Sequence, residues 1–587
     1  MRIRYYIVNI RKIWILSVLL LCCLLNVGAQ DFVDLTADEV RIDSLLPVYS
    51  WQKTLGRNYA DSTYAVSIEY PEFEEMTKAE IARYQAISGK PLNPLPEITQ
   101  SISVSRKQGI LEVSFVPLVF RDGKYQKLVS FKLGVRSQET GVRRRAGSGE
   151  RYSDHSVLRE GSWAKISIPE SGIYHLSDAL VKKAGFSNPS KVKIYGYGGA
   201  LQPEKLTGDY LAATDDLQEV PTVTIGGRRL FYGVGPVTWA SKDALTRTRN
   251  PYSDIGCYFL TESDEEPLAV DSAAFAAAYY PSNNDYHSLY EVDDFAWYHG
   301  GRNLYDRTLY KMNTPQSYTL NCNDTQGTLT VVLSYDGNFG AEVAVNDSVV
   351  DELSVSVSLD SYTEAAARTW TYRLNNLKEG DNKVTITQTR GNNLRLDYLA
   401  LTSDTPAPMP SLSKTAFAEP SFVYRIMNQD HHADSAVDMV IIIPTTQKWL
   451  SQAERIKQLH EQRDGLTVRI VPADELYNEF SSGTSDATAY RRYMKMLYDR
   501  AQTDEEMPRY LLLFGDGAYD NRMRTAEWSS CNPDDFLLCF ESENSFSHVY
   551  CYVSDDFYCL LDDEEQIEEG SRLYLGKPDV AAPGLAA

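Results

Sequence analysis

Cysteine is scarce in this sequence: there are eight in 587 residues, and no two of them are arranged as Cys-x-x-Cys. Two lie near the N-terminus, and the other six are Cys257, Cys322, Cys531, Cys539, Cys551 and Cys559. Structural zinc sites take their ligands from closely spaced cysteines, so no such site is expected. Six thiols in so long a chain are also too few for a disulfide framework, which leaves one or two bridges, or none, open.

Basic residues are outnumbered, because 58 Lys and Arg stand against 80 Asp and Glu and give a formal net charge of −22. A surface this acidic repels phosphate backbones and anionic lipids, which argues against nucleic acid as a partner. It suits an exported protein, or one that meets cations. The sequence requires no cofactor, and Ca²⁺ is a candidate for binding by its carboxylates.

Long apolar runs are absent after the N-terminus, so no transmembrane span is expected in the mature chain. At the N-terminus an apolar run over 13–25 follows four basic residues and precedes the small residues of 27–29. The run is shorter than the roughly 20 residues of a spanning helix. A charged segment, an apolar segment and a small-x-small cleavage site together predict a signal peptide over 1–29 and export of the protein.

The length predicts several domains, about three to five, because one hydrophobic core does not grow to this size. Up to about residue 405, short alternating segments separated by Gly-rich and Asp-Gly turns predict strands, with a hairpin at Asp122-Gly123. We expect a signal peptide (1–29), an N-terminal β domain (30–140), a linker (141–154), a β-rich domain (155–290), a β-sandwich or jelly-roll-like domain (291–405), a Pro-rich linker (406–435) and a last domain (436–587).

The last domain has a different pattern. Apolar runs at 438–443, 466–471 and 510–514 predict buried parallel strands. Segments 447–462 and 486–500 predict helices. We expect Asp486 to cap the second helix, and the first to bury Leu450, Ala453, Ile456 and Leu459. Strands that alternate with helices predict a parallel α/β sheet.

Two acidic turns form the candidate site. In an open parallel sheet, ligands bind at the carboxyl ends of the strands. The strand at 510–514 is followed by Asp516 and Asp520, and a second acidic turn holds Asp555 and Asp556. Carboxylates at such an edge bind Ca²⁺, recognise a basic residue or cap helices, and the spacing leaves these three roles open.

His548 and Cys551 are the nearest approach to a base and a nucleophile. A cysteine attacks as its thiolate, which a histidine within hydrogen-bond reach would generate. Since the members of such a pair usually come from different elements, ordinary packing is the favoured interpretation. We expect the pair His431-His432 to lie exposed in the linker and the acidic run 562–569 to be a solvated face.

Several motifs resemble a known family. In the α/β segment they are Met439–Pro444, Val471–Leu476, Ser482–Asp486, Tyr510–Gly517 and Tyr552–Asp556. Upstream they are Gly161–Lys165, Phe231–Pro236, Tyr252–Asp254 and Tyr258–Thr261. These motifs resemble the gingipain-like cysteine peptidases of the PorU type, the sortases or signal peptidases of the Bacteroidetes type IX secretion system. The resemblance extends over nearly the whole mature chain.

The resemblance implies β-rich N-terminal domains followed by a caspase- or gingipain-like α/β domain. It also implies a cysteine peptidase at the cell surface, associated with the outer membrane and its secretion components. Such an enzyme removes C-terminal sorting domains from exported cargo proteins and passes the cargo to an anionic lipopolysaccharide. The chemistry would be acyl transfer through a cysteine thiolate, with a histidine as the proton shuttle.

The sequence departs from the family pattern after 577–580, where it continues as Ala581-Ala-Pro-Gly-Leu-Ala-Ala587. The catalytic His and Cys of the family have no matching positions, so the resemblance assigns no catalytic residue here. We therefore expect an incomplete α/β domain and an inactive, truncated member of the family, through a frameshift, a gene-model error or a pseudogene end. The alternative is a non-catalytic surface binding or scaffold protein of the secretion machinery.

Overall fold

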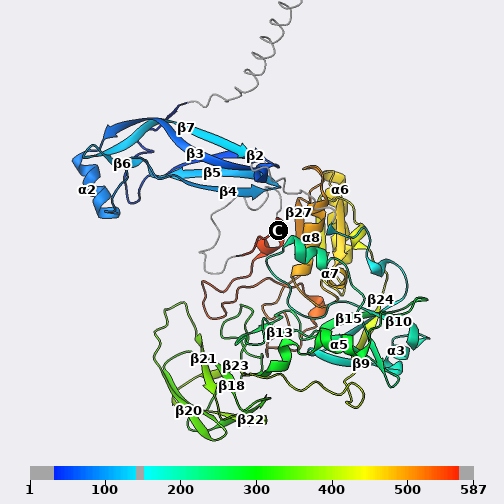
Figure 1. Ribbon diagram of the computed structural model, residues 1–587. Helices are drawn as coiled ribbons and strands as arrows, with labels where there is room; N and C mark the ends of the chain where they lie inside the picture. Colours follow the sequence, from blue (N-terminus) through cyan, green and yellow to red (C-terminus); the bar gives the residue numbers. More distant parts are fainter. Residues whose placement is uncertain (1–31, 140–150, 568–587) are drawn as a thin grey trace, which may run out of the picture. The chain divides into compact units, whose positions relative to one another are not determined.

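The computed structural model describes residues 32–139 and 151–567 (Figure 1). The chain divides into two compact units, 1–146 and 147–587. The expected signal peptide and most of the expected linker at 141–154 lie outside the described residues. Within the described residues, no helix is long and apolar enough to cross a membrane.

The first unit contains two antiparallel sheets around one core. One sheet has the order β1-β7-β3, with β6 on β7, and the other has the order β2-β5-β4. Their elements are β1 (Val33–Asp34), β2 (Tyr49–Gly56), β3 (Ser62–Glu75), α2 (Lys78–Ile87), β4 (Thr99–Ser105), β5 (Gln108–Phe115), β6 (Leu118–Arg121) and β7 (Lys124–Glu139). Alternate residues of β5 and β7, such as Val113 and Phe131, form the core, as the period-two pattern predicts.

The expected hairpin at Asp122-Gly123 is confirmed. It joins β6 to β7, with Arg121 opposite Lys124. Asp122 has a φ of 51° and Gly123 one of 74°. Two successive positive φ angles match the right-handed twist of the strands in a two-residue hairpin, which explains the Asp-Gly pair.

The second unit begins with a β-rich region. Its sheets have the orders β10-β15-β8-β24, β11-β12-β9 and β13-β14. The elements are β8 (Trp163–Ile168), β9 (Gly172–Leu176), α3 (Asp178–Lys183), β10 (Val192–Tyr195), α4 (Gly208–Ala213), β11 (Val223–Ile225), β12 (Arg228–Gly233), β13 (Val237–Trp239), β14 (Arg247–Arg249), β15 (Gly256–Glu262), α5 (Ser272–Tyr279) and β24 (Ser421–Ile426).

Strand β24 differs from the expectation, because it lies within the segment 406–435 that was assigned to a linker. It pairs with β8 in antiparallel fashion, with Ile426 opposite Trp163. The chain therefore returns to the β-rich region after the β-sandwich. The prolines of 406–410 dominate the local composition and conceal this strand, whose pairing is with a segment about 260 residues away.

The expected β-sandwich is present, with sheet orders β16-β23-β18-β21 and β17-β22-β19-β20. Its strands are β16 (His287–Glu291), β17 (Gln316–Cys322), β18 (Gly327–Tyr335), β19 (Phe339–Val345), β20 (Ser348–Val355), β21 (Ala366–Leu374), β22 (Gly380–Gly391) and β23 (Leu394–Ser403). Inward residues such as Val331 on β18 and Ile386 on β22 are fully buried in one core.

The parallel α/β sheet is confirmed, with order β26-β25-β27. Its elements are β25 (Met439–Ile443), α6 (Leu450–Arg463), β26 (Val468–Pro472), α7 (Ala473–Phe480), α8 (Thr488–Arg500) and β27 (Tyr510–Leu513). Helix α6 covers one face of the sheet, and α7 and α8 cover the other. The sequence pattern did not predict α7.

Two expectations for these helices, the cap at Asp486 and the apolar face of α6, can be compared with the structure. Asp486 lies one residue before the N-cap position of α8, which Ala487 occupies, although its carboxylate accepts the N–H of Thr488 at 2.8 Å. On α6, however, only Ala453 is fully buried, and Leu450 and Leu459 are 37% and 51% exposed. The contact of α6 with the sheet is therefore narrower than its apolar periodicity indicates.

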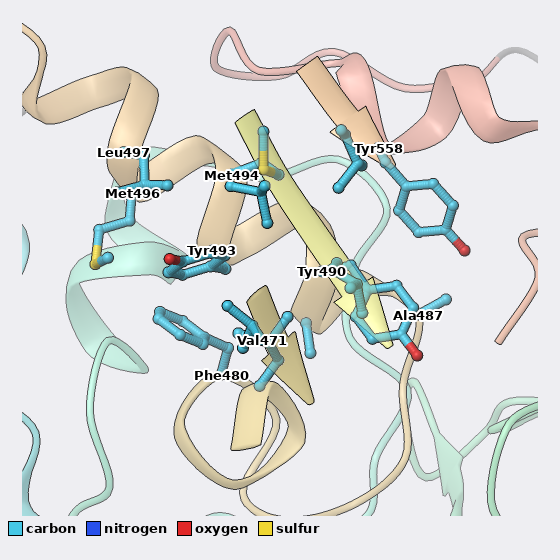
Figure 2. Close-up of a cluster of buried hydrophobic side chains, with 14 of the residues drawn as sticks. Val471, Phe480, Ala487, Tyr490, Tyr493, Met494, Met496, Leu497 and Tyr558 are labelled. Atoms are coloured by element: carbon cyan, nitrogen blue, oxygen red, sulfur yellow. The ribbon is translucent and has the colours of Figure 1, made fainter. Parts of the chain in front are cut away.

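Helix α8 is buried on all sides, with every residue from 488 to 499 in the interior. Its apolar side chains meet β26, α7 and the segment around Tyr558 in one cluster (Figure 2). The same helix buries three cations, which are Arg491, Arg492 and Lys495. A buried cation is tolerated only where acceptors surround it, so the neighbours of α8 are selected by its hydrogen bonds.

Those acceptors come from distant segments. Arg492 donates to the carbonyl of Phe480 at 2.7 Å, to Gln202 at 2.8 Å and to the carbonyl of Thr214. Lys495 donates to the carbonyl of Leu561 at 2.7 Å and pairs with Asp563. The beginning of the acidic run 562–569 is therefore not a fully solvated face, because α8 supplies it with cations.

The pair His431-His432 is not exposed as expected, since His432 is buried and the His431 side chain is only 12% exposed. His432 contacts Glu479 at 2.6 Å, and both side chains have no exposed surface. His431 lies between Asp434 and Glu475, at 2.9 and 2.8 Å. Burial lowers the pKa of each imidazole, but the hydrogen bonds with the carboxylates outweigh it and raise both pKa values to about 10.

Replacement of Arg492 by Met should destabilise the second unit by about 3 kcal/mol, because its acceptors would remain buried without a donor. The measurement is the urea midpoint, followed by circular dichroism. The matched control is Arg463→Met on α6, whose side chain is 77% exposed and whose loss should change stability by less than about 0.5 kcal/mol. Equal effects of the two substitutions would contradict this account of α8.

The two histidines should make stability fall at alkaline pH. Below pH 6.5 the imidazoles are protonated in both the folded and unfolded states, and the ion pairs contribute fully. Between pH 6.5 and 10 the unfolded state loses its protons first, so the free energy of unfolding should drop by at least about 2 kcal/mol. The double variant His431→Gln/His432→Gln should lose most of this slope, and the more exposed His460→Gln should keep it.

Candidate functional site

The loop after β27 crosses the carboxyl edge of the parallel sheet. Glycine is required where it does so: a Cβ at Gly515 would lie 2.8 Å from Pro444, and one at Gly517 would lie 2.1 Å from the sulfur of Cys539. Further along, the Thr446 hydroxyl donates to Asp535 at 2.8 Å. The segments that follow β25 and β27 are thus packed into one surface at the edge where ligands of parallel sheets bind.

The four aspartates singled out from the sequence are placed differently from one another. Asp516 is exposed, and its carbonyl accepts the N–H of Leu537 at 2.9 Å. Asp520 is 1% exposed, and its carboxylate accepts the N–H of Thr525 at 2.6 Å. Asp555 and Asp556 are exposed at the start of a short 3-10 helix.

Asp555 has a raised pKa, first through partial burial and then through repulsion from Asp556. Among the described residues, these four aspartates do not converge into a group of three carboxylates with ligand atoms within 4.8 Å of one another. The exposed ones are open to a basic side chain or a solvated ion. Asp520 alone is enclosed.

Glu541 is the buried carboxylate that the sequence did not point to. It is 1% exposed, and it forms a β-bridge with Val553, so it joins the segment after Asp520 to the turn that carries Asp555. Burial raises its pKa well above the usual value, and Asp520 raises it further. The residue stands in a polar stretch without periodicity, so no local signal distinguishes it from an exposed glutamate.

His548 and Cys551 do not form a catalytic pair. The Nε2 atom of His548 contacts Glu364 at 2.6 Å, and its ring stacks on Tyr298 at 4.6 Å. Burial raises the pKa of Cys551 to about 11. Ordinary packing, the favoured interpretation, therefore describes both residues.

The other thiols near the edge are equally inert. Burial raises the pKa values of Cys539 and Cys559 to about 12. A thiol with such a pKa is almost wholly protonated at neutral pH and is a poor nucleophile. No hydrogen bond joins a histidine to a cysteine within 32–139 and 151–567.

An ion-pair network fixes the loop after β27 to the β regions. Arg522 pairs with Asp254 at 2.8 Å and with Asp293 at 2.7 Å. Arg249, on β14, pairs with the same two aspartates and with Glu291. The network borders a cavity of about 190 Å³ into which four arginines project, namely Arg247, Arg249, Arg302 and Arg522.

The network also contains the one compact carboxylate group of the described residues, Glu291, Asp293 and Asp397. Guanidinium groups already engage it, since Arg247 and Arg249 both contact Glu291. Burial raises the pKa of Asp397 to about 8, which favours a proton there. With arginines in place of an ion, the group is best described as a structural junction.

Comparison with known proteins gives two findings of weight. Residues 432–581 match the model of peptidase family C25. The crystal structure of dimeric latent PorU from Porphyromonas gingivalis is similar, with a TM-score of 0.58 and 25% sequence identity over 71% of this chain and 47% of that chain. The chain thus spans about half the length of this relative.

Other matches are local. A family 35 carbohydrate-binding module from Clostridium thermocellum covers 20% of this chain and 88% of its own, at 18% identity and a TM-score of 0.15, which is too low to support an argument. No curated protein matches the chain.

The C25 match begins at the buried His432 and includes β25, β26, β27 and the carboxyl edge described above. The structural similarity covers 71% of this chain, so it extends beyond these residues. Together, the family match and the structural similarity support a PorU-type protein whose residues 432–581 correspond to a peptidase family C25 domain.

Proposed function

We propose that this chain provides the peptidase-domain scaffold of a PorU-like cysteine peptidase, or sortase, that cleaves the C-terminal sorting domains of type IX secretion cargo. The observation that carries the proposal is the family C25 match over 432–581, which includes the three strands of the parallel sheet. The similarity to PorU over 71% of the chain supports the same assignment for the β-rich regions.

Acyl transfer by such an enzyme needs a cysteine thiolate and a histidine that takes and returns its proton. The described thiols at the carboxyl edge have pKa values far above neutral and no histidine partner. We infer that the described part supplies the scaffold and the substrate-facing edge, and that it is inactive as a peptidase by itself. Asp516, Asp555 and Asp556 are exposed there and suit a basic side chain of a substrate.

The expected partners and location belong to the same proposal. The signal-peptide pattern supports export, and the strongly acidic composition argues against nucleic acid. We propose exported cargo with sorting domains and outer-membrane secretion components as partners, at the cell surface, with anionic lipopolysaccharide as the acceptor.

A non-catalytic scaffold of the secretion machinery is the second candidate function. Its favouring observation is that the described residues provide no cysteine–histidine pair. A scaffold needs the β regions and the ion-pair network around Arg522, but it needs no thiolate.

Disruption of the gene in the producing bacterium should leave sorting domains attached to exported cargo. The readout is mass spectrometry of cargo C-termini on the cell surface, and the control is a strain in which the gene is restored. Cargo that is processed normally in the disrupted strain would contradict the peptidase proposal. Cargo that is processed but released from the surface would favour the scaffold.

Cys551 should react slowly with iodoacetamide at pH 7.5, at least about 10-fold more slowly than free cysteine, because a pKa of about 11 leaves little thiolate. The His548→Ala substitution should leave this rate unchanged, since His548 contacts Glu364 rather than the thiol. Mass spectrometry of the labelled peptide measures the rate, with the urea-unfolded chain as the control. A rate that falls in the variant would show that the two residues are coupled.

A further inference from the structure

The carboxylate of Glu541 lacks a partner. The residue is 1% exposed, and neither Oε1 nor Oε2 has a hydrogen-bond partner among the described residues. An ionised carboxylate in such surroundings is costly unless a cation, hydrogen-bond donors or a proton compensates it. This glutamate is therefore the position at the carboxyl edge where a ligand would contribute most.

Asp520, a neighbour of Glu541, is also a buried carboxylate with an oxygen that lacks a hydrogen-bond partner. It is also 1% exposed, and while one oxygen accepts the N–H of Thr525, Oδ1 has no partner. The side-chain amide of Asn521 holds the two segments together, because it donates to the carbonyl of Cys539 at 3.1 Å and accepts its N–H at 2.9 Å. Repulsion between the two carboxylates is strong enough to contribute to the raised pKa of Glu541.

The cation that acts on Glu541 is Arg302, which forms ion pairs with other carboxylates. Arg302 lowers the pKa of Glu541, but it forms ion pairs with Glu204 and with Glu543, the latter at 3.3 Å. Cys539 and Cys551 lie close enough for Glu541 to raise their pKa values, so both remain thiols. The ligands on offer are thus carboxylate oxygens and not thiolates, which favours a hard cation over zinc.

We propose that Asp520 and Glu541 bind a Ca²⁺ ion, which links the loop after β27 to the segment of Glu541 that forms a β-bridge with Val553. Ca²⁺ accepts six to eight oxygen ligands in irregular geometry, so two carboxylates can be completed by backbone carbonyls and water. Mg²⁺ demands near-ideal octahedral geometry and dehydrates reluctantly, so it suits an enclosed pair less well. The site does not depend on the proposed peptidase function, since a scaffold protein would also need the loop after β27 held in place.

The test is a Ca²⁺ titration of the whole chain after dialysis against EDTA, with the thermal midpoint and calorimetric binding as readouts. Ca²⁺ at 100 times its Kd should raise the midpoint by at least about 2 °C, and Mg²⁺ at the same concentration should not. Glu541→Gln and Asp520→Asn should each weaken this binding at least about 10-fold. The matched control is Glu543→Gln, a carboxylate two residues away that is 64% exposed and should leave binding unchanged.

Each other outcome would overturn the proposal. Full retention of one Ca²⁺ site in Glu541→Gln would place the ion elsewhere on this acidic chain. A wild-type midpoint that Ca²⁺ does not move, together with a stabilised Glu541→Gln variant in EDTA, would show that a proton compensates the glutamate. If Glu541→Gln does not fold, Asp520→Asn decides between these outcomes by the same readouts.

Discussion

The burial of three cations on helix α8 is the constraint on which the rest of the second unit depends. A helix that is buried on all sides must find an acceptor for every charged group it carries. Arg492 finds them in the β-rich region, and Lys495 finds them in the segment after the sheet. The helix therefore selects its neighbours through hydrogen bonds as well as through apolar contact, and segments assigned to different domains in the sequence become one unit.

The same principle recurs at the carboxyl edge of the sheet. Arg522 joins the loop after β27 to Asp254 and Asp293, while Asn521 joins it to Cys539. A loop held from both sides presents a defined surface, and an edge of this kind is where parallel sheets place their ligands. The buried pair Asp520 and Glu541 lies at the centre of this arrangement, so a cation there would stabilise the surface that faces a substrate.

The chemistry of the edge is separate from its architecture. The thiols that lie there are protonated by burial, and the histidines are engaged with carboxylates or backbone carbonyls. A cysteine peptidase needs both a positioned edge and a thiolate, and the described part of this chain has such an edge but no thiol with a lowered pKa. A positioned edge and a reactive thiolate are therefore separate requirements, and burial at the edge works against the second.

The sequence by itself determined the elements that local periodicity specifies. The alternating β strands, the Asp122-Gly123 hairpin, the sandwich at 291–405 and the parallel strands at 439–443, 468–472 and 510–513 all follow from patterns of two to four residues. The motifs of the α/β segment carry the resemblance to gingipain-like peptidases, and the family C25 match over 432–581 supports it. The position of Asp520 after a buried strand follows in the same way, because the end of that strand is visible in the sequence.

Only the tertiary structure decided which polar residues are buried. The sequence predicted an exposed linker pair for His431 and His432 and did not single out Glu541. The carboxylates that act on these residues, Glu475, Glu479 and Asp520, lie 20 or more residues away in the sequence. Strand β24 likewise depends on β8, far upstream. Burial and pairing of this kind depend on contacts between distant segments, so a local sequence pattern does not predict them.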